Sequence, residues 1–224
     1  MTHKVHPKIY RIRDILNWNS RWLNKKTFPQ YLEEDFKIRE FLRKKLRDAG
    51  VSNIEIERSS GKINVIINTA RSGLIIGRSG AGVEELKKEI EREILKGKPA
   101  SALRAQARKQ ELKIEIQEIK NPWLSATLVS QWMAGQIEKR VRYRRVLKQA
   151  LDKVMVNKEV KGVRVEVSGR LDGVEIARRQ WLKKGQLPRQ TIRADIDYAE
   201  NRAYCTYGVV GIKVWIYKGE KFER

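Results

Sequence analysis

The chain has 224 residues, 41% of them hydrophobic, so it is long enough to fold as one large domain or two small ones. It carries 49 Lys and Arg against 27 Asp and Glu, a formal net charge of +22 at pH 7, and residues 1–120 and 121–224 share the excess equally. Both halves are therefore expected to face a large polyanion. The single cysteine, Cys205, excludes an intrachain disulfide, and no apolar run is long enough to span a bilayer, so we expect a soluble intracellular protein.

The first half of the chain predicts a small α+β domain. Residues 1–31 mix basic and aromatic side chains without periodicity, which is typical of an arm lying against something larger. Helical spacing predicts a helix from Glu33 to Ala49, and alternation predicts a hairpin of strands 53–58 and 62–68. A short apolar helix at 74–76, a Gly-rich turn, a second helix and a strand at 112–119 follow. Asn121-Pro122 then indicates a boundary near residue 120.

The second half predicts helices followed by strands. Apolar stripes over 124–155 favour two helices with a break near 142–145, because one straight helix would place Arg140 and Arg144 among the apolar positions. We expect a strand at 163–169, a helix over 172–185, and a final hairpin that turns at 199–201.

The turn Gly77-Arg78-Ser79-Gly80 stands immediately before a predicted helix. Two glycines three residues apart let a sugar-phosphate backbone approach, the helix start offers free N–H groups, and Arg78 adds charge. Alone, such a turn is more often a plain turn. The surrounding order of elements is that of a type II KH module, which favours RNA binding. Nucleotide hydrolysis is disfavoured because no Lys-Ser/Thr pair follows Gly80.

A dense basic segment is the second candidate site. Residues 139–148 hold six Lys and Arg, among them Arg140, Arg144, Arg145 and Lys148. If the helix buries Leu147, Leu151 and Val154, then Arg145 and Lys148 point outward with Arg144 on the flank, so a stripe faces phosphates. The alternative is an ordinary solvated helix face. Further basic residues extend the predicted surface: Arg170, Arg178, Arg179, Lys183 and Lys184.

Neither a catalytic nor a metal site is expected. The two histidines, His3 and His6, lie near the N-terminus, far from the carboxylates that a zinc shell would need. Asp195 and Asp197 share a strand face, but Arg193 on the same face favours a structural ion pair over acid-base chemistry. We therefore expect no enzyme activity and no cofactor.

Long stretches of the chain resemble the family of ribosomal protein three of the small subunit, in its bacterial or organellar form. The most specific are KGVRVEVSGRLDGVEIAR (161–178), RADIDY (193–198) and TYGVVGIKVWIYKGE (206–220), supported by TARSGLIIGRSG (69–80). The resemblance implies an α+β chain with an arm at 1–16, a type II KH domain at 17–120 and a C-terminal α/β domain at 121–224. In the last, two helices would pack on a mixed, mainly antiparallel sheet.

The resemblance also implies a function. Family members sit in the head of the small subunit, where messenger RNA enters. They bind small-subunit ribosomal RNA, touch ribosomal proteins ten and fourteen near proteins four and five, and aid messenger unwinding without nucleotide hydrolysis. The family's basic motif there maps onto Arg144, Arg145 and Lys148. The implied location is the cytoplasmic ribosome, or that of an organelle matrix.

The chain departs from the family pattern at two places named here, and two other functions are alternatives. His6 stands where the family usually has asparagine, and the basic stretch 96–110 is longer than expected and could form an extra RNA contact. A free KH regulator would follow from the KH module alone. A nuclease or DNA-repair lyase, an activity of some eukaryotic relatives, is disfavoured because no acid-base set is evident.

Overall fold

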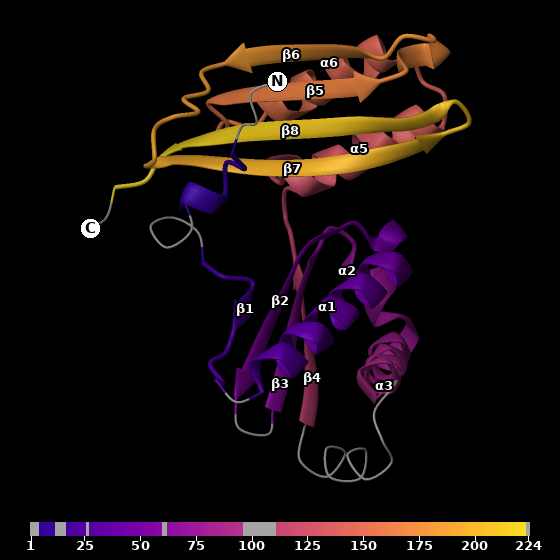
Figure 1. The fold of residues 1–224 in the computed structure, drawn as a ribbon, viewed down its shortest axis with the longest axis vertical. Helices are drawn as coiled ribbons and strands as arrows, with labels where there is room; N and C mark the ends of the chain where they lie inside the picture. The colour runs from indigo at the N-terminus through magenta and orange to yellow at the C-terminus, as the bar shows by residue number, and fades with distance from the viewer. Residues whose placement is uncertain (1–4, 12–16, 26, 60–61, 96–110, 223–224) are drawn as a thin grey trace. The chain divides into compact units, whose positions relative to one another are not determined.

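The structure, a computed structural model, describes residues 5–11, 17–25, 27–59, 62–95 and 111–222, and the predicted extra contact at 96–110 lies outside them. The chain divides into two compact units, one of Trp18–Lys120 and one of Asn121–Arg224 together with Met1–Asn17 (Figure 1). The first unit contains β1 (Ser20–Arg21), α1 (Phe28–Lys45), β2 (Val51–Ser59), β3 (Lys62–Thr69), α2 (Ser72–Ile76), α3 (Ala81–Leu95) and β4 (Glu111–Glu118). The second contains α5 (Ala126–Glu138), α6 (Tyr143–Met155), β5 (Gly162–Gly169), β6 (Arg178–Gly185), β7 (Ala194–Cys205) and β8 (Gly208–Glu220).

The first unit is a mixed sheet with helices on one face. The strand order is β1-β2-β3-β4, in which β2 and β3 form the predicted antiparallel hairpin and the outer pairs are parallel. Alternate residues of β2 and β3, such as Ile56 and Val65, point to the core and meet Ile38 of α1 and Ile90 of α3. This packing positions the Gly-rich turn between α2 and α3 at the edge of a rigid layer.

The N-terminal boundary of α1 differs from the sequence prediction. The helix begins at Phe28, with Pro29 in its first turn, and not at Glu33. Pro is favoured there because its missing N–H is one that a helix start leaves unpaired in any case. Ser20 and Arg21, predicted to be irregular, pair in parallel with β2.

The second unit is an antiparallel sheet with two helices on one face. Its order is β6-β5-β8-β7, and every pairing among the described strands is antiparallel, so the mixed component allowed by the sequence is not seen in them. α5 lies against β7 and β8, and α6 lies against β5 and β6 (Figure 1). The core between them joins Val165, Val214 and Ile216 of the sheet to Met133 and Leu147 of the helices.

Three local predictions in this unit need correction. The segment 172–185 is not a helix: after a single 3₁₀ turn at Leu171–Gly173, residues Arg178–Gly185 form edge strand β6. The final hairpin turns at 206–207, and 199–201 lie within β7. The two predicted helices are present, but the break between them lies at 139–142, slightly earlier than expected.

The described residues of the N-terminal arm pack on the second unit. Lys8 forms an ion pair with Asp197 of β7 at 2.8 Å, and the His6 ring meets the Tyr198 ring edge-on at 4.7 Å between centroids. Arg11 is completely buried. The arm therefore forms part of the fold of this unit and covers part of the sheet face opposite α5 and α6.

Candidate nucleic-acid interface

The Gly-rich turn lies directly before α3, as the sequence predicted. Gly77 (φ +69°), Ser79 (φ +53°) and Gly80 (φ +83°) all have positive φ, so the chain reverses sharply between α2 and α3. Gly77, Arg78 and Ser79 are exposed. A turn of this shape leaves its own backbone and the first N–H groups of α3 open to an anionic backbone.

Gly82, just after the predicted motif, was missed by the sequence analysis. A Cβ at Gly82 would lie 2.5 Å from the carbonyl oxygen of Ile75, so only glycine lets the start of α3 approach the end of α2 this closely.

Beside the turn, Leu74 is 62% and Ile76 is 39% exposed. Two exposed apolar side chains next to a turn that carries Arg78 form a surface on which bases and backbone of a single strand can lie together.

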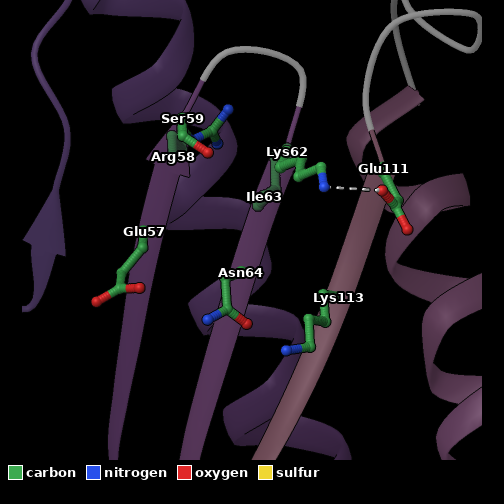
Figure 2. A pocket seen from close by; sticks show the side chains of 8 residues that line it. All are labelled: Glu57, Arg58, Ser59, Lys62, Ile63, Asn64, Glu111 and Lys113. Atoms are coloured by element: carbon green, nitrogen blue, oxygen red, sulfur yellow. Dashed lines mark ion pairs between the residues drawn. The ribbon is translucent and has the colours of Figure 1, made fainter.

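The sheet face of the first unit that lies opposite the helices has a different character. A hollow of about 300 Å³ there is lined by Glu57, Asn64, Lys62, Glu111 and Lys113, among others (Figure 2). Lys62 and Glu111 form an ion pair at 3.8 Å (Figure 2). Each cation that lines the hollow is paired with a carboxylate: Lys62 with Glu111, Lys113 with Glu115, and Arg58 with Glu34 and Asp35. The hollow therefore offers little attraction to a polyanion. In this unit the Gly-rich turn is the better candidate for RNA contact.

The basic stripe on α6 is exposed as the sequence predicted. Val146, Leu147, Ala150, Leu151 and Val154 are buried against the sheet. Arg144, Arg145 and Lys148 lie on the remaining face and are all exposed. Among the described residues, no acidic side chain forms an ion pair with these three. We call Arg144, Arg145 and Lys148 the α6 stripe.

The charges of this helix oppose its own dipole. The N-terminus of a helix carries partial positive charge and favours acidic side chains, yet the first turn of α6 holds Arg144 and Arg145 and no acidic residue. The Nε of Arg144 donates to the Tyr143 hydroxyl at 3.1 Å, which raises the pKa of Arg144. The arrangement concentrates positive potential at one helix end, which suits an external phosphate.

Arg140, in the loop between α5 and α6, has a left-handed backbone (φ +60°). Its N–H donates to the Ile137 carbonyl and that of Val141 to the Gln136 carbonyl, which closes the C-terminus of α5. Glycine is the usual residue at such a helix end, because a Cβ costs about 1 kcal/mol in this conformation. An exposed arginine there is strained, and such strain points to a role for the side chain.

The structure divides the basic residues after β5 between two faces. Arg170 is exposed, but its Nε donates to the Val174 carbonyl (3.1 Å) and its Nη1 to the Tyr207 carbonyl (3.2 Å), so it also holds two loops together. Arg178 and Lys184 of β6 lie on the side of α6, where Lys184 pairs with Asp152 (3.8 Å). Arg179 and Lys183 lie on the opposite side, because strand residues alternate. The helix prediction had placed all of them on one surface.

The predicted acid pair forms structural ion pairs, although not with Arg193. Asp195 pairs with Lys221 (3.2 Å), Asp197 with Lys8, and Arg193 with Glu220 (2.9 Å). A bulge after Asp195 shifts the register of the strand. Across the part of the chain that the structure describes, no group of three or more His, Cys, Asp or Glu is arranged to hold a metal ion, and no helix is long and apolar enough to cross a membrane.

Comparison with known proteins gives two family matches and many similar chains. Residues 37–124 match the KH domain model, and residues 133–216 match the model of the C-terminal domain of ribosomal protein S3. Small ribosomal subunit protein uS3 of Caldicellulosiruptor saccharolyticus is 48% identical over 221 residues, 98% of this chain and 93% of the relative. Protein uS3c of Guillardia theta is 42% identical over 222 residues, 99% of this chain and 97% of the relative.

Proposed function

Because the chain belongs to the ribosomal protein uS3 family, we propose that it is a structural constituent of the small ribosomal subunit that binds ribosomal and messenger RNA. The proposal assigns residues 1–16 to an arm, 17–120 to a type II KH domain and 121–224 to a C-terminal α/β domain. It assigns no catalytic activity to the chain and needs no cofactor.

The α6 stripe is the observation that carries RNA binding. Arg144 and Arg145 stand in the first turn of α6, at the positive end of its dipole, and Lys148 follows one turn later. None of the three forms an ion pair with an acidic side chain among the described residues, so a phosphate backbone is a suitable counter-charge. We assign messenger contact to the stripe and to its neighbour Arg140. Arg178, beside α6, and Arg170 extend the surface, with part of the Arg170 guanidinium engaged by carbonyl groups.

Gly77, Arg78, Ser79 and Gly80 form the second proposed contact. Positive φ angles at Gly77, Ser79 and Gly80 turn the backbone toward solvent, Arg78 adds a cation, and the exposed side chains of Leu74 and Ile76 flank the turn. This geometry suits a single RNA strand in the manner of a KH domain.

On this account the chain aids messenger unwinding without hydrolysing a nucleotide. Cationic side chains where messenger RNA enters would hold one strand while translocation supplies the work. We place ribosomal proteins ten and fourteen of the small subunit among its contacts, with proteins four and five close by, in the cytoplasmic ribosome or that of an organelle.

Sedimentation tests the proposal. A tagged chain is expressed in its host, and the lysate is separated on sucrose gradients at moderate and at high salt. The chain is expected to sediment with small subunits and to stay with them through the salt wash. A chain that sediments free of ribosomes, or with a few selected messengers, contradicts the proposal and favours a free KH regulator.

A further inference from the structure

The sheet of the second unit presents an aromatic and cationic strip on the face away from α5 and α6. Arg179, Trp181 and Lys183 alternate along edge strand β6, and half-buried Leu182 between them packs into the core on the other face. Trp181 is 49% exposed, and the Arg179 side chain is 60% exposed. The strip therefore displays one large aromatic ring with a cation on each side.

The ring of Trp181 is held by residues of the neighbouring strands. The guanidinium of Arg164 on β5 lies 4.3 Å from the centre of the Trp181 ring and 5.5 Å from that of Trp215 on β8. The Glu166 side chain, 4% exposed, accepts from Arg164 Nη2 (3.1 Å) and from Arg179 Nε (2.6 Å). Arg164 is itself only 12% exposed. This buried network fixes the ring before any ligand arrives, which lowers the entropic cost of stacking on it.

Charge identifies the kind of ligand. Glu166, opposite Trp181 in the strand register, is buried and pairs with both Arg164 and Arg179, so one carboxylate faces two guanidinium groups and one net positive charge remains on this side of the ring. Lys183 forms no ion pair within the described part of the chain. An exposed aromatic ring with net positive charge on both sides matches the alternation of base and phosphate in a single nucleic-acid strand.

We propose that the outer strip of β6 is a further contact for single-stranded RNA, in which a base stacks on Trp181 and the flanking phosphates pair with Arg179 and Lys183. The inference rests on the proposed RNA-binding function, but it concerns a different face of the sheet from the α6 stripe. An edge strand could instead accept a strand from a protein partner through its free backbone groups. The cations and the fixed ring favour RNA, because backbone pairing would need neither.

Binding of the purified full chain to two fluorescent probes tests the strip: a short oligouridine and an abasic strand of the same length. Trp181→Ala is expected to weaken oligouridine binding at least about fivefold, the loss of one stacked base, and to leave abasic binding unchanged. Trp181→Phe restores most of the affinity and shows that the fold is intact. Tyr204→Ala is the matched control, since Tyr204 is a 64% exposed aromatic on the opposite edge strand, and it is expected to bind both probes normally.

Charge variants give a second measurement. Lys183→Gln is expected to lower the slope of log affinity against log salt by about 0.7, one phosphate contact, whereas Lys37→Gln, at a lysine paired with Glu33 on α1, leaves it unchanged. Normal oligouridine binding by Trp181→Ala overturns the inference, and so does an equal loss for the abasic strand. A triple variant with Arg144, Arg145 and Lys148 changed to Gln separates the two proposals. If Trp181→Ala binds normally and the triple variant does not bind, the outer strip of β6 is not an RNA contact but the proposed function is supported. If the wild-type chain binds neither probe, the proposed function fails with it.

Discussion

The guanidinium of Arg11 donates to the main-chain carbonyl oxygen of Thr191 at 2.8 Å, which joins the N-terminal arm to the segment before β7. The same group also donates to the carbonyls of Pro7 (2.7 Å) and Arg189 (3.1 Å). Arg11 is completely buried and gives the carbonyls of Pro7 and Arg189 a charged donor, whereas the Thr191 carbonyl also accepts from the Ala194 N–H at 3.4 Å.

Arg11→Ala is therefore expected to destabilise the second unit by about 2–4 kcal/mol, because it removes three charged hydrogen bonds and leaves a cavity in place of a completely buried side chain. Urea denaturation followed by tryptophan fluorescence measures the change. Lys8→Gln is the control: its ion pair with Asp197 is partly exposed and is expected to be worth less than about 1 kcal/mol. Equal losses for the two variants would show that Arg11 does not hold the arm.

Arg58 gives the corresponding prediction for the first unit. Its side chain is 4% exposed and pairs with Glu34 and Asp35, each at 2.6 Å. Arg58→Met is expected to cost about 3–5 kcal/mol, because two buried carboxylates lose their cation. Lys37→Gln, which removes the surface pair of Lys37 with Glu33 on the same helix, is expected to cost less than about 0.5 kcal/mol. An Arg58→Met protein as stable as Lys37→Gln would contradict the account.

Arg140 predicts that stability and binding change in opposite directions. Arg140→Gly removes a Cβ from a left-handed backbone, so it is expected to stabilise the unit by up to about 1 kcal/mol while weakening RNA binding. Thermal unfolding and RNA titration of the same preparation measure both effects. Arg145→Gln, at a residue of the α6 stripe within the helix, is expected to weaken binding without the gain in stability. Unchanged RNA affinity in Arg140→Gly would remove Arg140 from the interface.

The environment of His6 predicts that the stability of the N-terminal arm depends on pH. Burial, followed by the charge of Lys8, lowers the pKa of His6 below its ordinary value of 6.5, and the neutral Nδ1 accepts the Lys8 N–H at 3.2 Å. A lowered folded-state pKa means that this stabilisation is complete above 6.5 and is lost as the pH falls through the folded value. Hydrogen exchange of residues 5–11, corrected for intrinsic rates, is expected to accelerate between pH 7 and pH 5.

His6→Asn is the control for that measurement, since asparagine keeps an acceptor for the Lys8 N–H and does not titrate in this range. The pH dependence of arm exchange is expected to disappear in this variant. If His6→Asn retains it, another group controls the arm.

Sequence periodicity predicted those elements whose burial follows a regular spacing. On α6, Leu147, Leu151 and Val154 recur at helical intervals, and the exposure of Arg145 and Lys148 followed from them. In β6, Leu182 is partly buried and the other seven residues are exposed. The sequence of this strand therefore does not alternate between apolar and polar residues, which is the pattern that predicts a strand. Pairing with β5 decided its structure, and pairing between distant strands leaves no local signal in the sequence.

The same reason explains what the sequence analysis missed at the candidate sites. The sequence predicted a turn at 199–201, but the chain reverses at 206–207, directly before Gly208, which adopts φ +123°. Arg164 contacts Trp181 across two neighbouring strands. Arg11 joins the arm to Thr191, a residue 180 positions later in the chain. Such contacts follow from register, which composition and spacing do not define.

Translation by reconstituted ribosomes whose small subunits carry Arg144, Arg145 and Lys148 changed to Ala tests the central claim most directly. The control subunits carry Lys37, Lys44 and Lys62 changed to Gln, which also removes three cations, each paired with a glutamate in this structure. The α6 variant is expected to assemble normally, to translate unstructured messengers at the control rate, and to slow on messengers with a stable hairpin. Equal rates for the two variants on structured messengers, or equal slowing of the α6 variant on both kinds of messenger, would contradict the claim that the α6 stripe holds messenger RNA as it unwinds.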